Sequence, residues 1–364
     1  MVFYHIHSIL TDNHSPKQQS ISILMSATTF CIVGLGRAGN FHLTSIKSIK
    51  NAKLLSVVDT NLDLIKQYGE AEGCNAYQTI DEALADPKLD AVVIASPTDS
   101  HFEYIIKALN AGKHVFTEKP LGHALHEVAE CFDLAASKGL ALYLGFQRRY
   151  DKSFMALKES LPQLGNLRLW KASSRDNPRP SIAYLSISGN IFHDMLIHDF
   201  DMLTYLLGAA IPEKVFAAGY AHDKEIANLN DFDTVLCTVQ YPNGLICSID
   251  TSRISAYGYD QRLEVFGEHG MAKAENQLNN TLQVSTAAGT NHSPANFSFP
   301  QRYKEAYTEI INQFIIGIEN GVLNNVSKQA CMLSHLIADA ALEAALHNKV
   351  VDFDAQYGDK IRKG

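Results

Sequence analysis

The chain has 364 residues, of which 46% are hydrophobic and 19% charged, and its formal net charge at pH 7 is -8. This composition excludes a largely disordered chain and predicts globular domains with sizeable cores. The length favours two domains. The negative balance argues against nucleic acid or an anionic membrane as a partner. No apolar run approaches the roughly 18 residues that span a bilayer.

We expect no secretory signal at the start of this sequence. The first 24 residues have no sustained apolar core and no small-residue cleavage site. Met25 resembles a natural start, so we expect residues 1–27 to be a disordered extension or the product of a miscalled start codon. The six cysteines form no C-x-x-C or zinc-like spacing, which predicts reduced thiols in a cytoplasmic protein.

Residues 28–148 alternate short apolar runs with helical stretches. Near-continuous apolar runs are typical of parallel strands covered on both faces. Helical periodicity marks residues 62–72 and 102–110, and Gly112 follows the second helix as a stop signal. This alternation predicts right-handed crossovers and an α/β Rossmann domain with a doubly wound parallel sheet. The predicted strands are residues 30–33, 54–58, 91–95, 114–116 and 140–144.

Residues 149–364 follow a different pattern, which predicts an α+β domain for substrate binding and oligomerisation. Two segments of period-two alternation are joined by Tyr241-Pro242-Asn243-Gly244, so they form a β-hairpin in an open, mostly antiparallel sheet. A final helix at about 328–348 can pack back on the first domain. The other helices are expected at 151–160 and 190–207, and the strands at 167–172, 233–239, 244–250 and 261–267.

The turn Gly34-Leu35-Gly36-Arg37-Ala38-Gly39 follows a predicted strand and opens a predicted helix, which is the context of a dinucleotide-binding G-x-G-x-x-G motif. Gly34 permits the tight turn, Gly36 lets the backbone approach a pyrophosphate at the helix N-terminus, and Gly39 lets the helix pack on the strand. Asp59, which ends the next strand, can bind the adenosine ribose and would repel a 2′-phosphate. The motif favours NAD over NADP. The alternative is a glycine-rich loop beside a solvated Asp.

Glu118-Lys119-Pro120 follows another predicted parallel strand, at the sheet edge where such sheets bind ligands. Pro120 restricts Lys119 to a rigid, non-helical turn. A lysine beside a positive nicotinamide can stabilise a substrate alkoxide or share its proton. Taken alone, a lysine on a turn is more often a surface charge.

Asp194 and His198 are four residues apart and are expected to share a helix face. A carboxylate beside an imidazole can orient it as a base that takes a hydroxyl proton. The alternatives are an ion pair on the helix surface or two ligands of a metal. His193 points elsewhere on the helix and no third ligand stands at a diagnostic spacing, so we expect no metal.

Four motifs together resemble the glucose-fructose oxidoreductase, inositol dehydrogenase and MocA-like family over residues 29–353. They are Gly34–Gly39 with His42, Ser96–His101, Ala111–Pro120 and Gly145–Asp151. The resemblance implies cofactor contacts at the matching positions Arg37, Ala38, Ser96, Thr98, His101 and Glu118. It implies Lys119, Asp194 and His198 as the catalytic triad, which also contacts substrate. Further substrate contacts are implied from Arg149, Tyr257 and Asp176, and the assembly is implied to be a homotetramer packed through the second-domain sheets.

Two segments, Gly189–Met202 and Tyr257–Arg262, are similar to the inositol 2-dehydrogenases of that family. The resemblance implies NAD-dependent oxidation of myo-inositol to 2-keto-myo-inositol (scyllo-inosose), a reaction of inositol catabolism. The alternatives are scyllo-inositol or a pyranose sugar as substrate, or a dehydratase-like or glycosidase-like relative that returns the hydride. A non-catalytic NAD- and sugar-binding regulator is also an alternative, but such a relative is expected to lose Lys119 or His198.

Overall fold

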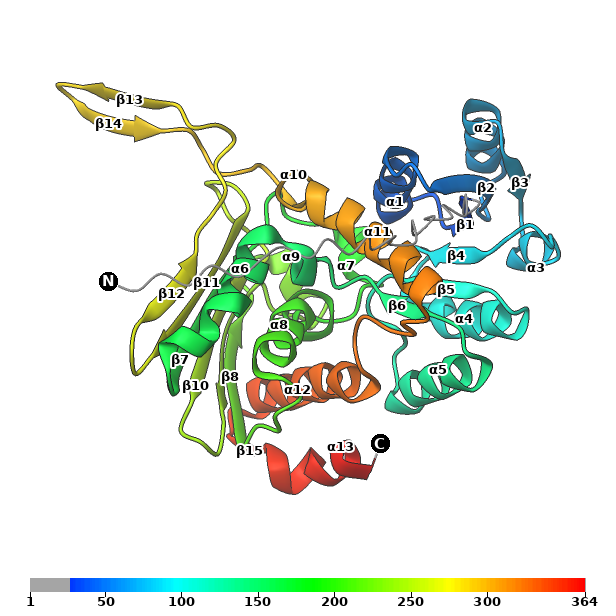
Figure 1. Ribbon diagram of the computed structural model, residues 1–364. Coiled ribbons are helices and arrows are strands. Elements are labelled where there is room, and N and C mark those ends of the chain that lie inside the picture. Colours follow the sequence, from blue (N-terminus) through cyan, green and yellow to red (C-terminus); the bar gives the residue numbers. More distant parts are fainter. Residues whose placement is uncertain (1–26, 364) are drawn as a thin grey trace, which may run out of the picture.

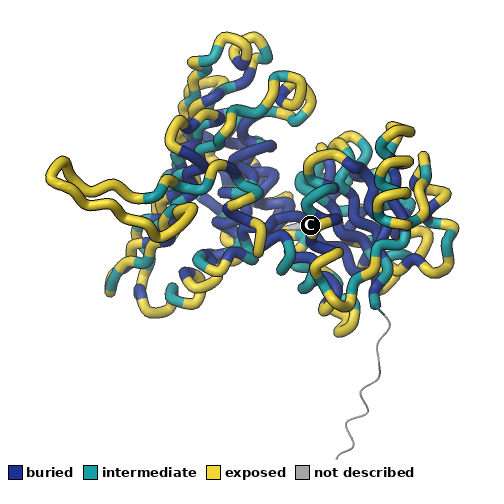
Figure 2. The backbone as a smooth tube through the Cα atoms, turned by 90° about the horizontal axis from the view of Figure 1, so that it is seen from above, coloured by how far each residue is buried: buried dark blue, intermediate teal, exposed yellow. Residues whose placement is uncertain are grey.

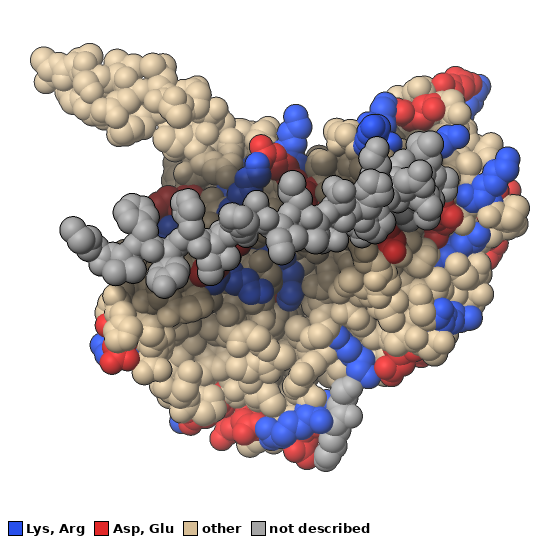
Figure 3. Space-filling model, in the orientation of Figure 1, with Lys and Arg blue, Asp and Glu red and all other residues tan. Residues whose placement is uncertain are grey.

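The computed structural model describes residues 27–363, so the predicted N-terminal extension lies outside it except for residue 27. The described chain forms two lobes (Figures 1 and 2). In Figure 3, lysine and arginine are interspersed with aspartate and glutamate on the visible face. None of the described helices is both long enough and apolar enough to cross a bilayer.

The first lobe is a six-stranded parallel sheet of order β3-β2-β1-β4-β5-β6. The strand order reverses between β1 and β4, the place where such sheets bind ligands. All four residues of β4 are buried, as the apolar run predicted. The strands are β1 (Thr28–Val33), β2 (Ala52–Val58), β3 (Asn75–Tyr77), β4 (Ala91–Ile94), β5 (His114–Thr117) and β6 (Leu142–Leu144).

Helices cover this sheet, and the doubly wound prediction is confirmed. The predicted helix at 62–72 matches α2 (Leu62–Glu72), which begins at the N-cap Asn61 and ends at Gly73 in the left-handed conformation. The remaining helices of the lobe are α1 (Arg37–Ser48), α3 (Ile80–Leu84), η1 (Thr98–Ser100), α4 (His101–Asn110), α5 (Leu125–Lys138) and η2 (Gln147–Tyr150).

The second lobe is a seven-stranded sheet of order β12-β11-β7-β10-β9-β8-β15. It is mostly antiparallel, as predicted, with β7 and β10 as a parallel pair. The predicted hairpin is confirmed, because β9 and β10 pair antiparallel across Tyr241–Gly244. The strands are β7 (Leu167–Arg175), β8 (Lys214–Tyr220), β9 (Thr234–Gln240), β10 (Ile246–Ser252), β11 (Asp260–Gly267), β12 (Met271–Ala274) and β15 (Val351–Asp352).

One face of this sheet is covered by α8 (Ile197–Leu207) and α12 (Lys328–His347), which contact each other, while α12 also contacts β8. The hairpin of β13 (Gln283–Thr286) and β14 (Gly289–His292) projects from the body of the protein and is exposed throughout (Figures 1 and 2). The shorter elements are α6 (Lys152–Ser160), η3 (Leu161–Leu164), α7 (Ile182–Leu185), η4 (Phe192–Leu196), α9 (Lys224–Ala227), α10 (Phe299–Arg302), η5 (Asp354–Gly358) and α13 (Asp359–Lys363).

Two helices from the C-terminal part of the chain pack against the first lobe. Helix α12 contacts α5 of the first lobe, as expected for the final helix. The sequence prediction missed α11 (Lys304–Asn320), which returns to the first lobe and packs on α1. Its Phe314 is fully buried against the rings of Phe30, Phe116 and Tyr143. The dinucleotide-type lobe therefore includes a helix from far along the chain.

Candidate active site

The glycine turn between β1 and α1 leaves room for a phosphate group. Gly34 has φ of +92°, and a Cβ there would lie 2.6 Å from the backbone nitrogen of Ser96. At Gly39 a Cβ would lie 2.0 Å from the carbonyl oxygen of Gly34, so the close helix–strand contact requires glycine. At Gly36, by contrast, a Cβ would meet nothing within 4 Å. The open space at Gly36 lies at the N-terminus of α1, where unpaired N–H groups favour an anion.

Asp59 lies beside this turn, at the end of β2. Its Oδ2 accepts a hydrogen bond from the Leu35 amide at 2.8 Å and its Oδ1 accepts one from the Asn61 amide at 2.9 Å. Each carboxylate oxygen has two lone pairs. The carboxylate can therefore hold the turn and still accept hydrogen bonds from ribose hydroxyls.

The loops after β4 and β5 are tied together by His101. Its ring is buried, and its two nitrogens lie 2.7 Å from the carbonyl oxygen of Pro120 and 2.9 Å from that of Ser96. These contacts place the His101 ring between the two loops, and its predicted cofactor contact stays a prediction. Ser96 and Thr98 are partly exposed on the first of them.

Glu118 and Arg37 border the same region through different contacts. Glu118 Oε1 lies 2.8 Å from His42 Nε2, which anchors the turn after β5 to α1. The Arg37 guanidinium carbon lies 4.3 Å from the centre of the Phe299 ring, and the next residue, Ala38, is partly exposed. Arg37 thus links the start of α1 to α10 of the second lobe.

Lys119 and Asp194 meet across the two lobes although 75 residues separate them. Lys119 Nζ donates to the backbone oxygen of Asp194 at 2.6 Å and to its Oδ1 at 3.2 Å. The same carboxylate accepts hydrogen bonds from Tyr184 Oη at 2.7 Å and from Arg253 at 3.0 Å. The Lys119 ammonium has a third N–H, which remains for a ligand oxygen.

His198 is close to this pair but is not oriented by Asp194, so that part of the sequence interpretation is wrong. Within residues 27–363 no hydrogen bond joins the two side chains, and His198 Nδ1 is buried without a partner. The reason lies in the backbone, because η4 is a π-helix that gives way to α8 at Ile197. In a π-helix the four-residue spacing no longer stacks side chains as it does in an α-helix. The His198 ring instead packs edge-on against the Phe146 ring, with the two ring centres 6.0 Å apart.

The charges around Lys119 set the pKa values of its neighbours. Burial would raise the pKa of Asp194, but Lys119 and Arg253 outweigh burial and hold that pKa below its ordinary value. Burial, Lys119 and Arg148 all lower the pKa of His198 well below 6.5, so its ring is neutral at pH 7 and carries a nitrogen lone pair.

Asp176 completes this group of charges. Burial and the nearby Asp194 raise its pKa to about 6, against the opposing effect of Arg253, Arg148 and Lys119. Its charge interactions with these residues place Asp176 near Lys119 and Asp194, and its contact with substrate stays a prediction. The cluster therefore combines one carboxyl group that stays ionised with a second that titrates near neutrality.

Two other predicted substrate contacts lie in different surroundings. The Arg149 guanidinium forms a bidentate pair with Asp201, at 2.7 and 2.8 Å, and also bonds Thr204. Tyr257 is about half exposed, and its hydroxyl contacts Arg175 and Asp260. Arg175 is the last residue of β7, and Asp176 follows directly after the strand. Tyr257 thus bonds Arg175 and Asp260, and Arg149 bonds Asp201 and Thr204, so the substrate contacts of Tyr257 and Arg149 stay predictions.

Sequence reasoning missed the residues that support this cluster. Arg253 is fully buried between Asp194 and Asp231, with bonds of 3.0 and 2.9 Å. Arg148 is likewise buried, and donates to Asp199 at 2.7 Å. Each arginine contacts an acidic residue more than 20 positions away, so no local spacing signals the pairs. The available hint was that each arginine stands within four residues of the end of a predicted strand, where a buried arginine requires a partner.

Comparisons with known proteins agree with this geometry. Residues 28–146 match the profile of the GFO/IDH/MocA oxidoreductase family with an NAD-binding Rossmann fold, and residues 162–273 match the GFO/IDH/MocA C-terminal domain. The chain belongs to this family. It is an NAD-dependent oxidoreductase, and the expected cofactor is confirmed at the level of the family.

Several relatives have named activities. The chain is 35% identical to a myo-inositol 2-dehydrogenase of Thermotoga maritima, covering 90% of this chain and 99% of that one. It is also 35% identical to an inositol 2-dehydrogenase of Rhizobium meliloti, over 88% and 98% of the two chains. The structure matches scyllo-inositol dehydrogenase from Lactobacillus casei with bound NAD(H) and scyllo-inositol, with a TM-score of 0.84, 28% identity, and coverage of 90% and 99%. Cyclitol dehydrogenase activity is thus supported for this chain.

Proposed function

We propose that this protein oxidises myo-inositol to 2-keto-myo-inositol with NAD. The observation that carries the proposal is the cluster of Lys119, Asp194, Asp176 and neutral His198 at the carboxyl edge of the parallel sheet. Such a cluster supplies both a cation and proton acceptors for a secondary hydroxyl. The relatives named above act on inositols, which supports a cyclitol as substrate.

The residues of the first lobe fit the cofactor. Gly36 leaves open space at the N-terminus of α1 for the pyrophosphate, and Asp59 can accept from the ribose hydroxyls. We assign Gly34, Gly36, Arg37, Ala38, Gly39, Asp59, Ser96, Thr98 and Glu118 to this site, with His101 holding Ser96. When bound, NAD supplies the hydride acceptor, and the protein's residues position and deprotonate the alcohol.

The protein's own residues divide the proton chemistry. His198 takes the hydroxyl proton, because its lowered pKa keeps the ring neutral at pH 7. Lys119 stabilises the developing alkoxide through its free N–H. Asp194 holds Lys119 in place and is itself held by Arg253 and Tyr184. Asp176 offers a polar contact to a neighbouring substrate hydroxyl.

The direct test is a substrate panel with purified protein and NAD, measured as NADH absorbance. We expect myo-inositol to give the highest kcat/KM, with scyllo-inositol second and glucose weakest. A preference for scyllo-inositol would support the alternative favoured by the Lactobacillus casei match. Lack of NADH formation with every cyclitol would contradict the proposal.

We further propose a cytoplasmic homotetramer packed through the second-lobe sheets. All six cysteines are free, which fits a reducing compartment. Leu236, Ile246 and Phe266 are exposed on the sheet face opposite the helices, and Ile246 and Phe266 flank the same position of β7. An exposed apolar face of this kind is typical of a surface that binds another protein subunit. In sedimentation experiments, Ile246→Glu should yield smaller species than wild type, and a monomeric wild type would contradict the proposal.

A further inference from the structure

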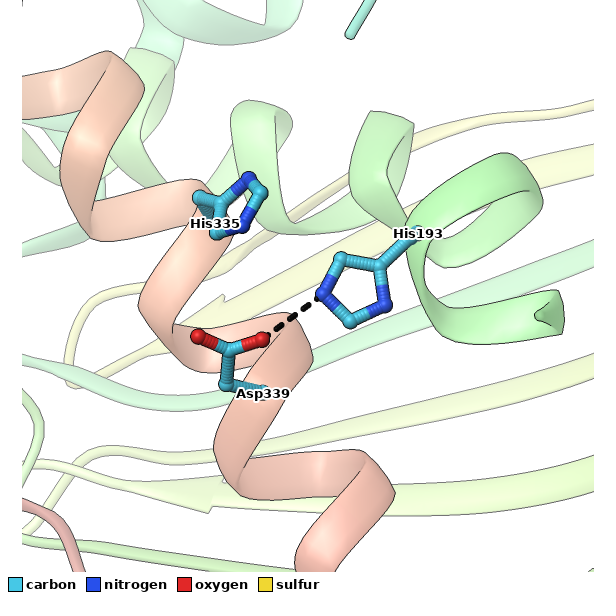
Figure 4. Close-up of side chains that lie close together, drawn as sticks. All are labelled: His193, His335 and Asp339. Atoms are coloured by element: carbon cyan, nitrogen blue, oxygen red, sulfur yellow. Dashed lines mark hydrogen bonds and ion pairs between the residues drawn. The ribbon is translucent and has the colours of Figure 1, made fainter. Parts of the chain in front are cut away.

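A second polar cluster lies where η4 packs against α12. His193 projects from η4, and His335 and Asp339 project toward it from successive turns of α12 (Figure 4). One nitrogen or oxygen of each residue lies within 4.8 Å of the others. We propose that His193, His335 and Asp339 bind a divalent transition-metal ion such as Zn²⁺. This site is separate from the proposed NAD and inositol sites.

The hydrogen bonds of His193 prepare one ring nitrogen for a cation. Its Nδ1 lies 3.1 Å from Oδ1 of Asn190, and that oxygen also accepts from the backbone amides of Phe192 and His193. These two amide donors identify the Asn190 atom as an acceptor, so His193 Nδ1 carries the proton. In a neutral ring Nε2 then has a lone pair, and it faces Oδ1 of Asp339 at 2.9 Å. A lone pair opposite a carboxylate oxygen favours a cation between them.

The other ligands have the support expected of a metal site. His335 is buried on α12, and its ring faces that of His193. His335 and Asp339 are four residues apart on a regular helix, so they share one face. The ring centres of His193 and His335 lie 5.1 Å apart. Because Zn–N and Zn–O bonds are about 2 Å long, side-chain rotation must bring these three atoms toward a common centre when an ion binds.

The ligand types decide which ions fit. Two imidazoles and one carboxylate suit Zn²⁺, Co²⁺, Ni²⁺ or Cu²⁺ better than Mg²⁺ or Ca²⁺, which prefer oxygen. Three protein ligands leave a fourth position for water. A bound ion would link α12 to η4, the element that carries Asp194, and would therefore stabilise the packing beside the active site. The competing interpretation is a simple ion pair between His193 and Asp339.

Calorimetric titration with ZnCl₂ distinguishes the two interpretations. The full-length protein is used without an affinity tag, after chelator treatment, and without NAD or polyol. We expect one site in the wild type that His193→Gln and Asp339→Asn each weaken. Loss of an outer-sphere partner already costs about 10- to 100-fold in affinity, so loss of a ligand should cost at least that.

The control variant is His347→Gln, which removes an exposed histidine from the same helix and should leave Zn²⁺ affinity unchanged. The N-terminal His5, His7 and His14 are present in every protein compared, so they cannot produce the difference. Circular dichroism and NAD binding check that each variant is folded. Equal Zn²⁺ affinity in wild type and both ligand variants, or no saturable binding to wild type, would overturn the proposal. Neither result depends on which polyol is oxidised.

Discussion

Lys119 has two separable effects at the scale of single residues. In the proposed mechanism it offers an N–H to the substrate oxygen, and its charge lowers the pKa of His198. We predict that Lys119→Ala lowers kcat by about 10²- to 10⁴-fold. Because a positive neighbour is lost, the pKa of His198 should rise, and the acidic limb of the kcat/KM profile should move to higher pH. Lys119→Arg keeps the charge and should leave that limb in place. Unchanged kcat in Lys119→Ala would exclude the assigned role.

The ionised Asp176 carboxylate should lower the free energy of unfolding, because the residue is buried beside Asp194. Its pKa is raised from 3.8 to about 6, so the native state disfavours the ionised carboxylate. This penalty is complete above pH 6 and vanishes below pH 3.8, where both states are protonated. We predict that Asp176→Asn raises the free energy of unfolding at pH 7 by up to about 3 kcal/mol. Urea titrations across this pH range should show the advantage shrinking as pH falls. A constant difference would refute the electrostatic explanation.

The individual residues show how far local sequence patterns reach. Lys119 and Asp59 could be predicted because each follows a strand at the ligand-binding edge of a parallel sheet. Arg253 could not, because its partners Asp194 and Asp231 are defined only by the packing of separate segments. The Arg149–Asp201 pair was missed for the same reason.

At the scale of elements, two glycines of the β1–α1 turn are expected to serve different purposes. Gly36 is needed for NAD binding, and Gly39 is needed for folding. A Cβ at Gly36 meets open space with φ near -70°, whereas a Cβ at Gly39 collides with the Gly34 carbonyl. We predict that Gly36→Ala leaves the melting temperature of the free protein unchanged but weakens NAD binding. Gly39→Ala should lower that melting temperature. Thermal unfolding with and without NAD measures both, since a ligand at 100 times its Kd stabilises by about 2.7 kcal/mol. If NAD raised the melting temperature of Gly36→Ala as much as that of the wild type, the proposed phosphate site would be contradicted.

The elements themselves were predictable where the pattern is local. The buried strands of the first lobe and α2 follow from apolar runs, helical periodicity and end signals. The π-helix η4 was not predictable from periodicity, because its five residues continue the same apolar pattern as α8. That change of helix type altered the relation of Asp194 to His198. The return of α11 to the first lobe depends on contacts such as Phe314 with Phe30, which no local window contains.

At the scale of the whole molecule, a buried ion pair joins the start of α6 to the segment that returns toward the first lobe. Both side chains of Arg302 and Asp151 are at least 95% buried, and the guanidinium makes two contacts with the carboxylate. Asp151 is also the N-cap of α6, accepting from the Ser153 and Phe154 amides. Removing Arg302 would therefore leave a buried carboxylate with no cationic partner in this pair.

We predict that Arg302→Met lowers the free energy of unfolding by about 3–5 kcal/mol. A matched control is the adjacent pair Lys152 and Glu305, whose side chains are 82% and 76% exposed at a nitrogen–oxygen distance of 2.6 Å. Lys152→Ala should leave the free energy of unfolding nearly unchanged, because water screens an exposed pair. Urea unfolding of both variants compares buried and exposed charges at one junction. Equal destabilisation would mean that burial of Arg302 and Asp151 does not decide how firmly the returning segment is held.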